Sequence, residues 1–169
     1  MTIRLAVIGA GIMGSDHARI LAQELPGAVV RIACDASEPR ARQLADSLGI
    51  AHVSTDPLAV IIRPDVDAVV IASPDFTHAP LSLACIAAGK PVLCEKPLSQ
   101  SSAECLSVID AETATARRFI QLGFMRRFDR SYTEMKAAVA DGRSVSSRST
   151  ANSSPPSRAT VSAGRTQAT

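Results

Sequence analysis

The stretch that decides the fold is residues 3–14, IRLAVIGAGIMG. Its first half is short, apolar and rich in β-branched residues, which is typical of a buried parallel strand. Its second half carries Gly9, Gly11 and Gly14 in the spacing G-x-G-x-x-G, and the residues that follow predict a helix over 12–25. A glycine motif between a strand and a helix is the context that indicates dinucleotide binding.

Each glycine of this motif has a distinct expected role. Gly9 permits the tight turn, Gly11 lets the backbone approach a pyrophosphate, and Gly14 lets the helix pack closely on the strand. The start of the helix supplies unpaired N–H groups and the positive end of the helix dipole. We therefore predict that the dinucleotide is contacted by Gly9, Gly11, Ile12, Met13 and Gly14. The alternative is a set of glycines that serves only the turn and the packing.

The alternation of strand and helix continues along the chain. Further strands are predicted at 29–34, 51–53, 68–72, 91–94 and 119–123, and further helices at 38–48, 79–88, 101–116 and 131–140, with a brief helix opening at 56–57. Six strands with interleaved helices predict an α/β doubly wound parallel Rossmann sheet with helices on both faces. Ligands bind such sheets at the carboxyl ends of the strands.

Asp35 ends the second predicted strand, 21 residues after Gly14, close to the offset expected for a ribose-binding acid. A carboxylate there accepts hydrogen bonds from ribose hydroxyls and repels a 2′-phosphate, so NAD is favoured over NADP. Arg40 and Arg42 follow and could soften that preference. The alternative role for Asp35 is a helix cap, but Ser37 is the better cap.

Polar residues also follow the fourth strand, in the run ASPDFTH at 72–78. Pro74 rules out a longer strand and forces a loop over the crevice. Ser73 and Asp75 are small polar residues suited to the nicotinamide ribose. An isolated His78 would more often be a residue at the start of a helix with its ring in solvent.

The run CEKP at 94–97 ends the fifth strand. Lys96 should project toward the nicotinamide ring, where a cation lowers the pKa of a reacting hydroxyl and orients it. Pro97 restricts Lys96 to extended geometry. Glu95 can pair with a positive neighbour. Taken alone, Lys96 would more often be a solvated surface lysine. A capping box, Ser101-x-x-Glu104, is expected to begin the next helix.

Composition limits the other classes of function. The four cysteines, at 34, 85, 94 and 105, contain no C-x-x-C and fit buried reduced thiols, and we predict no metal site. We see no signal-peptide layout and no apolar run near the ~18 residues that span a membrane, so a cytoplasmic location without membrane partners is expected.

Charge is unevenly distributed. The net charge is +2, but residues 143–169 hold four Arg and no acid, while residues 1–142 hold 14 basic against 16 acidic residues. The mildly acidic body indicates no nucleic-acid partner. The Ser-, Thr- and Arg-rich segment 143–169 is predicted to be disordered, because it cannot bury enough apolar surface to order itself. A second hypothesis is a reading-frame slip near codon 143.

Together with GFMRRFD at 123–129, these motifs make the chain resemble the Gfo/Idh/MocA oxidoreductases, and GFMRRFD is most similar to their inositol 2-dehydrogenase branch. The resemblance implies NAD(P)-dependent oxidation of a sugar or cyclic polyol, here one such as myo-inositol, and Asp35 makes NAD the expected cofactor. It implies that Lys96 is the catalytic motif lysine and that His78 lies near the nicotinamide. His17 matches a histidine often found shortly after the glycine motif. Cofactor-binding residues are then Ser73, Pro74, Asp75, His78, Glu95 and Lys96, in addition to Asp35 and the glycine motif.

The resemblance also implies a second, α/β domain that carries the general-base histidine in a D-x-x-x-H motif. This chain has no histidine after His78. We therefore expect a Rossmann domain over 1–124, the start of the linker and substrate domain over 125–142, and a disordered tail over 143–169. The chain is expected to be the cofactor-binding half of a polyol dehydrogenase, and the homo-oligomer typical of the family is doubtful for it. The alternative is a non-catalytic dinucleotide-binding module or regulator.

Overall fold

The computed structural model describes residues 2–142. The chain divides into two compact units, Met1–Arg127 and Phe128–Thr169. In the second unit the described element is helix α6, Arg130–Ala140, and the side chain of Asp129 caps it by accepting the backbone N–H of Ser131. The predicted disordered tail, and with it the hypothesis of a frame slip, lies outside the described residues.

The first unit is built on a parallel sheet. Its strands are β1 (Ile3–Ile8), β2 (Ala28–Cys34), β3 (His52–Ser54), β4 (Ala68–Ile71), β5 (Val92–Cys94) and β6 (Ile120–Leu122). Within residues 2–142 they form one six-stranded sheet in the order β3-β2-β1-β4-β5-β6, and every pair is parallel. The order reverses between β1 and β4, so the predicted doubly wound α/β fold is confirmed.

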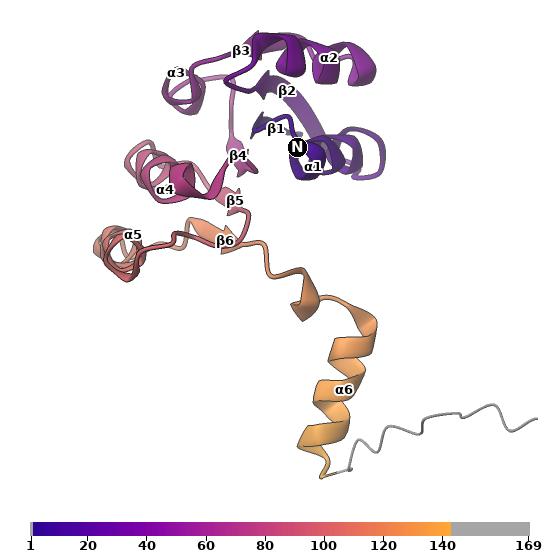
Figure 1. Cartoon of the computed structure of the whole chain (residues 1–169), viewed down its shortest axis with the longest axis vertical. Helices are drawn as coiled ribbons and strands as arrows, with labels where there is room; N and C mark the ends of the chain where they lie inside the picture. The colour runs from indigo at the N-terminus through magenta and orange to yellow at the C-terminus, as the bar shows by residue number, and fades with distance from the viewer. Residues whose placement is uncertain (1, 143–169) are drawn as a thin grey trace, which may run out of the picture. The chain divides into compact units, whose positions relative to one another are not determined.

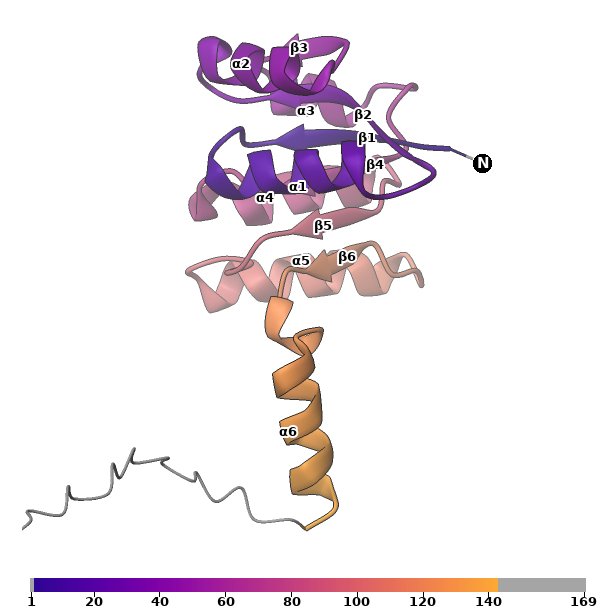
Figure 2. The ribbon, with the colours of Figure 1, turned by 90° about the vertical axis from the view of Figure 1, so that its right-hand side faces the viewer.

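Helices cover both faces of this sheet, as predicted (Figure 1). They are α1 (Ile12–Gln23), α2 (Glu38–Leu48), α3 (Pro57–Ile61), α4 (His78–Ala87) and α5 (Ser102–Ala114), with 3₁₀ turns η1 (Asp75–Thr77) and η2 (Met125–Arg127). Figures 1 and 2 show α1 and α2 on one face and α3, α4 and α5 on the other. The 3₁₀ turns were not predicted.

The two faces have separate cores, and β1 feeds both. Leu5 and Val7 pack with residues of α1 and α2, whereas Ala6 and Ile8 pack with residues of α3 and α4. This is the alternation that a strand imposes, because successive side chains point to opposite faces. Both sets are buried, which explains why residues 5–8 of β1 form a continuous apolar run.

Two helix starts differ in detail from the prediction. Ser37 occupies the cap position of α2, but its side chain makes no capping hydrogen bond. At α5 the Ser101 hydroxyl accepts the N–H of Glu104, as a capping box requires. The reciprocal bond is replaced, because the Glu104 carboxylate accepts from the hydroxyl of Ser99 and that same hydroxyl oxygen accepts the N–H of Ser101. The Ser99 hydroxyl therefore accepts the Ser101 N–H, which in a capping box the glutamate side chain accepts.

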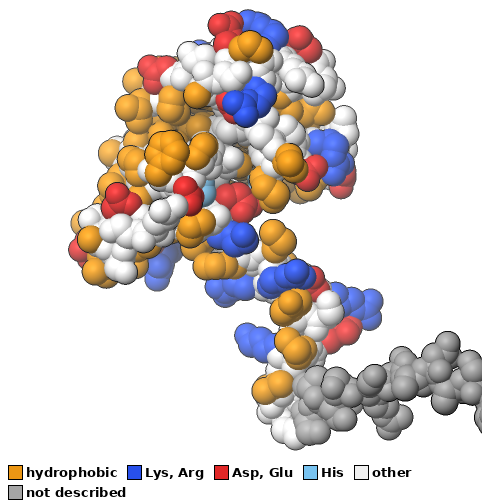
Figure 3. Space-filling view, viewed as in Figure 1, with side chains coloured by type: hydrophobic (Ala, Val, Ile, Leu, Met, Phe, Trp, Pro, Cys, Tyr) orange, Lys and Arg blue, Asp and Glu red, His pale blue; other side chains and the backbone are white. Residues whose placement is uncertain are grey.

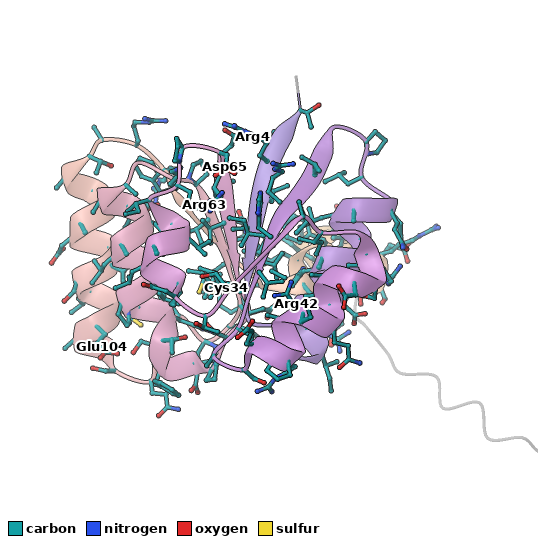
Figure 4. All side chains as sticks on the ribbon, turned by 90° about the horizontal axis from the view of Figure 1, so that it is seen from above. Arg4, Cys34, Arg42, Arg63, Asp65 and Glu104 are labelled. Atoms are coloured by element: carbon teal, nitrogen blue, oxygen red, sulfur yellow. The ribbon has the colours of Figure 1, made fainter. Side chains whose placement is uncertain are left out.

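Two arginine–aspartate ion pairs lie at the amino end of the strands. Figure 4 shows Arg4, Arg63 and Asp65 toward one end of the sheet, with Cys34, which ends β2, toward the other. Arg63 Nε lies 2.8 Å from Asp65 Oδ1, and Arg4 pairs with Asp67 over 2.7 Å. The Arg63–Asp65 and Arg4–Asp67 pairs are therefore remote from the carboxyl edge where ligands bind. Figure 3 shows that Lys and Arg side chains are interspersed with Asp and Glu over this unit.

Candidate functional site

The turn between β1 and α1 is packed too tightly for any residue but glycine at two positions. Gly9 has a φ of +101°, and a Cβ there would lie 2.5 Å from backbone atoms of Ala72 and Ser73. A Cβ on Gly14 would lie 1.7 Å from the carbonyl oxygen of Gly9. The turn therefore holds α1 against β1 and against the loop that follows β4.

Gly11 is different, because a Cβ added there would meet nothing within 4 Å. It is the cap residue of α1 and offers no side-chain acceptor to the first-turn N–H groups. Ile12 and Met13 of that first turn are exposed, at the positive end of the helix dipole. This is the arrangement that holds an anionic phosphate.

Asp35 lies directly after β2 and is tied to the backbone by both oxygens. Oδ2 accepts the N–H of Ala10 and Oδ1 accepts the N–H of Ser37, each over 2.8 Å. Arg40 Nε lies 3.4 Å from Oδ1, and the Asp35 side chain is 11% exposed. Asp35 therefore fixes the cap residue of α2 through its backbone N–H, and it also faces the glycine turn.

A cleft of about 630 Å³ opens at the carboxyl ends of the strands. Predicted site residues that line it are Gly9, Gly11, Ile12, Met13, Asp35, Ser73 and Pro74. Lining residues that were not proposed as ligands include Ala36, Arg40, Thr55, Pro57, Phe76, Thr77 and Leu81. Thr55 and Pro57 follow β3, so the rule that ligands bind at the carboxyl edge would have found them.

The loop after β4 is held by its own hydroxyls. Thr77 Oγ1 donates to the carbonyl oxygen of Pro74 over 2.6 Å, and Ser73 Oγ lies 2.6 Å from Thr77 Oγ1. Because the single hydroxyl proton of Thr77 is donated to the Pro74 carbonyl oxygen, the Ser73 hydroxyl is the donor in the second hydrogen bond. Asp75 does not line the cleft, since its Oδ2 accepts from Gln100 Nε2 and its Oδ1 accepts the N–H of Phe76.

His78 is buried, with 2% of its surface exposed. Its Nδ1 lies 2.6 Å from the carbonyl oxygen of Pro97, and its Nε2 lies 2.8 Å from that of Ser73. The alternative of a ring in solvent is wrong, because the ring joins the loop after β4 to the loop after β5.

The CEKP segment places its two ionisable side chains differently. Glu95 is 9% exposed, and its Oε1 lies 2.9 Å from Nε2 of His17 on α1. Lys96 is exposed, and its Nζ makes no hydrogen bond or ion pair with the part of the chain that the structure describes. Gly14, Asp75, His78, Glu95 and Lys96 do not line the 630 Å³ cleft. The sequence pointed to His17 by motif position alone, and nothing local marked its contact with Glu95.

Cys34 and Cys94 end two of the strands at this edge, and both are buried. Burial raises the pKa of each thiol to about 11. They are protonated at neutral pH and supply no nucleophile. Among residues 2–142, no group of three or more His, Cys, Asp or Glu side chains is arranged to hold a metal ion. No helix in this range has the length and apolar character needed to cross a membrane.

Comparison with known families and proteins agrees with this geometry. The model of an oxidoreductase family with an NAD-binding Rossmann fold matches residues 3–124. Inositol 2-dehydrogenase 2 of Saccharopolyspora erythraea is 50% identical over 143 residues, which are 85% of this chain and 42% of that protein. Inositol 2-dehydrogenase of Rhodococcus erythropolis is 45% identical over 140 residues, 83% of this chain and 40% of the relative.

Solved structures give the same result. Scyllo-inositol dehydrogenase from Lactobacillus casei, crystallised with NAD(H) and scyllo-inositol, superposes with a TM-score of 0.80 at 31% identity and covers 84% of this chain and 42% of its own. Myo-inositol 2-dehydrogenase from Lactobacillus plantarum superposes with a TM-score of 0.80 at 30% identity, over 84% and 42% of the two chains. The chain thus spans about two fifths of the length of the relatives it matches.

Proposed function

The chain belongs to the Gfo/Idh/MocA oxidoreductase family, and we propose that its cleft binds NAD for the oxidation of a cyclic polyol such as myo-inositol. The observation that carries the proposal is the contrast between Gly14, which has no room for a Cβ, and Gly11, which has open space. The packing of α1 on β1 requires a glycine at position 14. Open space at the start of a helix, beside a cleft, fits the approach of a pyrophosphate.

The residues around the cleft fit the parts of a dinucleotide. The uncapped first turn of α1 would hold the pyrophosphate, and Asp35 would accept from the adenosine ribose. Ser73, whose own proton is directed to Thr77, keeps lone pairs with which it can accept from the second ribose. His78 would act as a positioning residue for this loop, since its ring contacts two protein carbonyl groups.

We propose NAD as the cofactor in preference to NADP because of Asp35. Its carboxylate is fixed by two backbone N–H groups, so it cannot swing away to admit a 2′-phosphate. Arg40 lies beside the carboxylate and lines the cleft, and its guanidinium partly offsets the negative charge. We therefore expect the chain to bind NAD more tightly than NADP without excluding NADP entirely.

Lys96 is the proposed catalytic residue. Its ammonium group has no protein partner in residues 2–142, so it can donate to the hydroxyl of a substrate and orient that group for loss of its proton. The nicotinamide, when bound, supplies the carbon that accepts the hydride. In the family pattern the base is a histidine of the second domain, so we assign turnover to a polypeptide that includes that domain.

A calorimetric titration of the purified chain with NAD⁺ and with NADP⁺ tests the binding half of this proposal. We expect NAD⁺ to bind and NADP⁺ to bind at least tenfold more weakly. Lys96→Ala should leave the affinity for NAD⁺ within threefold, with Lys136→Ala as the matched control, because Lys96 is assigned to the reacting centre. A folded chain that binds neither nucleotide would overturn the proposal.

A further inference from the structure

Glu95 lies where three segments of the Rossmann unit meet. Its backbone N–H continues the ladder between β5 and β4 by donating to the carbonyl oxygen of Ile71 over 2.8 Å. Its side chain turns inward, with Oε1 2.9 Å from His17 Nε2 and Oε2 accepting the N–H of Lys96 over 3.3 Å. Both carboxylate oxygens are therefore engaged within the protein.

His17 reaches Glu95 from the helix that begins at the glycine motif. It lies three residues after Gly14, so the two share one face of α1. Its side chain is 23% exposed and that of Glu95 is 11% exposed. The contact spans 78 residues of sequence and joins the helix that starts at the proposed phosphate site to the segment that carries Lys96.

Gly123, directly after β6, provides the space for the Glu95 side chain. A Cβ there would lie 3.0 Å from Glu95 Oε1, 3.2 Å from its Cδ and 3.3 Å from the carbonyl oxygen of Cys94. The N–H of Gly123 donates to that same carbonyl oxygen over 2.8 Å. The third segment therefore closes behind the carboxylate and leaves it no room on that side.

We propose that His17 is a positioning residue, which through Glu95 fixes the Lys96 segment to α1, so that a dinucleotide bound at α1 constrains Lys96. The inference rests on the proposed function. It assigns His17 and Glu95 to the support of the site, in place of direct contact with the cofactor. The physical reason is that a buried, hydrogen-bonded carboxylate is held in one orientation, and the backbone that bears Lys96 is held with it.

The test uses the reactivity of Lys96 toward an amine-acylating reagent, read by peptide mass spectrometry on the whole chain. The chain has three lysines, at 90, 96 and 136. Lys136 is exposed on α6 and serves as the internal reference, whereas Lys90 donates to the carbonyl groups of Arg63 and Val66. In the unsubstituted chain, saturating NAD⁺ should slow the labelling of Lys96 relative to Lys136 at least fivefold.

His17→Leu, which removes the donor, should reduce this protection to less than twofold while the calorimetric affinity for NAD⁺ changes by less than threefold. His17→Gln, which keeps a donor, should retain most of the protection. Gly123→Ala leaves His17, Glu95 and Lys96 themselves unsubstituted, and it should behave like His17→Leu because its methyl group displaces the Glu95 carboxylate. A merely structural role would lower the melting temperature and leave the protection at saturation unchanged.

The outcomes separate this inference from the proposed function. Full protection in both His17→Leu and Gly123→Ala would overturn the positioning role and leave NAD binding intact. Binding of NAD⁺ without protection of Lys96 in the unsubstituted chain would overturn it as well. If the chain binds no NAD⁺, the proposed function fails. The labelling of Lys96 without nucleotide then decides: a rate that His17→Leu changes more than threefold supports the contact, and an unchanged rate overturns it.

Discussion

The carboxylate of Asp35 accepts the backbone N–H of Ala10 across 2.8 Å, although the two residues are 25 positions apart in the chain. Ala10 lies inside the glycine turn, and Asp35 directly follows the neighbouring strand β2. The same side chain that we assign to the ribose therefore also fixes the turn that we assign to the pyrophosphate. Substitution of Asp35 should consequently affect both the choice of nucleotide and the geometry of the turn.

Asp35→Asn separates the charge from the shape. The amide keeps an acceptor for Ala10, but it removes the negative charge that would repel a 2′-phosphate. We expect NAD⁺ to bind about tenfold more weakly, equivalent to ~1.4 kcal/mol, and the ratio of NADP⁺ to NAD⁺ affinity to rise. Asp46→Asn, on the exposed side of α2, is the control. An unchanged nucleotide ratio in calorimetry would remove Asp35 from the specificity argument.

The glycines of the motif should divide into two classes. Gly14→Ala places a methyl group 1.7 Å from the Gly9 carbonyl oxygen, so we expect it to lower the melting temperature strongly or to prevent folding. Gly11→Ala meets open space, so we expect the melting temperature to change little. Its methyl group would nevertheless lie where the pyrophosphate approaches, and NAD⁺ affinity should fall at least tenfold. Equal stability of the two variants would contradict this division.

Removal of the His78 imidazole should cost stability more than its size suggests. His78→Phe fills a similar volume but leaves the carbonyl groups of Ser73 and Pro97 without their partner. An unsatisfied buried acceptor costs about 1–3 kcal/mol, so the free energy of unfolding in urea should fall by at least that amount. His52→Phe, at an exposed position on β3, should have little effect. Equal losses in both variants would show that the two carbonyl contacts contribute nothing specific.

The thiols should react in an order set by burial. Burial raises the pKa of Cys34 and Cys94 to about 11 and that of Cys85 to about 12. At pH 8 these three are almost entirely protonated and shielded, whereas Cys105 is partly exposed. Alkylation by iodoacetamide followed by peptide mass spectrometry should therefore modify Cys105 first. Early modification of Cys34 would show that the cleft opens further than the structure indicates.

The ion pairs at the amino edge of the sheet should make stability depend on pH in acid. The hydrogen bond from Arg63 lowers the pKa of Asp65 to about 2, and Arg4 holds the pKa of Asp67 well below its ordinary value. Because the folded-state pKa values are depressed, the stabilisation is fully present above about pH 5, where the unfolded carboxyls are also ionised, and is lost progressively as the pH falls toward 2. Asp67→Asn should therefore be less stable than the unsubstituted chain at pH 7, and the difference should shrink by pH 2.5. A difference in urea unfolding that stays constant over this range would argue against the pair.

Much of the fold could be predicted because its signals are local. The apolar run of β1, the glycines that follow it and the capping box at the start of α5 are each properties of a few adjacent residues. The order of strands and helices then restricts the topology, because crossovers between parallel strands are right-handed. The ends of elements were less accurate. Helix α1 was predicted to Leu25 but ends at Gln23, since Leu25 donates to the carbonyl oxygen of Ile20 in place of continuing the helix.

The sequence by itself therefore determined the α/β class, the order of the elements and which motifs lie at the carboxyl edge, since neighbouring residues encode these features. Only the tertiary structure decided what the side chains at that edge contact. The burial of His78 between two loops, the pairing of Glu95 with His17 and the room left by Gly123 each depend on segments that are far apart in the chain. Such contacts exist only after the sheet has brought those segments together, and no local pattern specifies them.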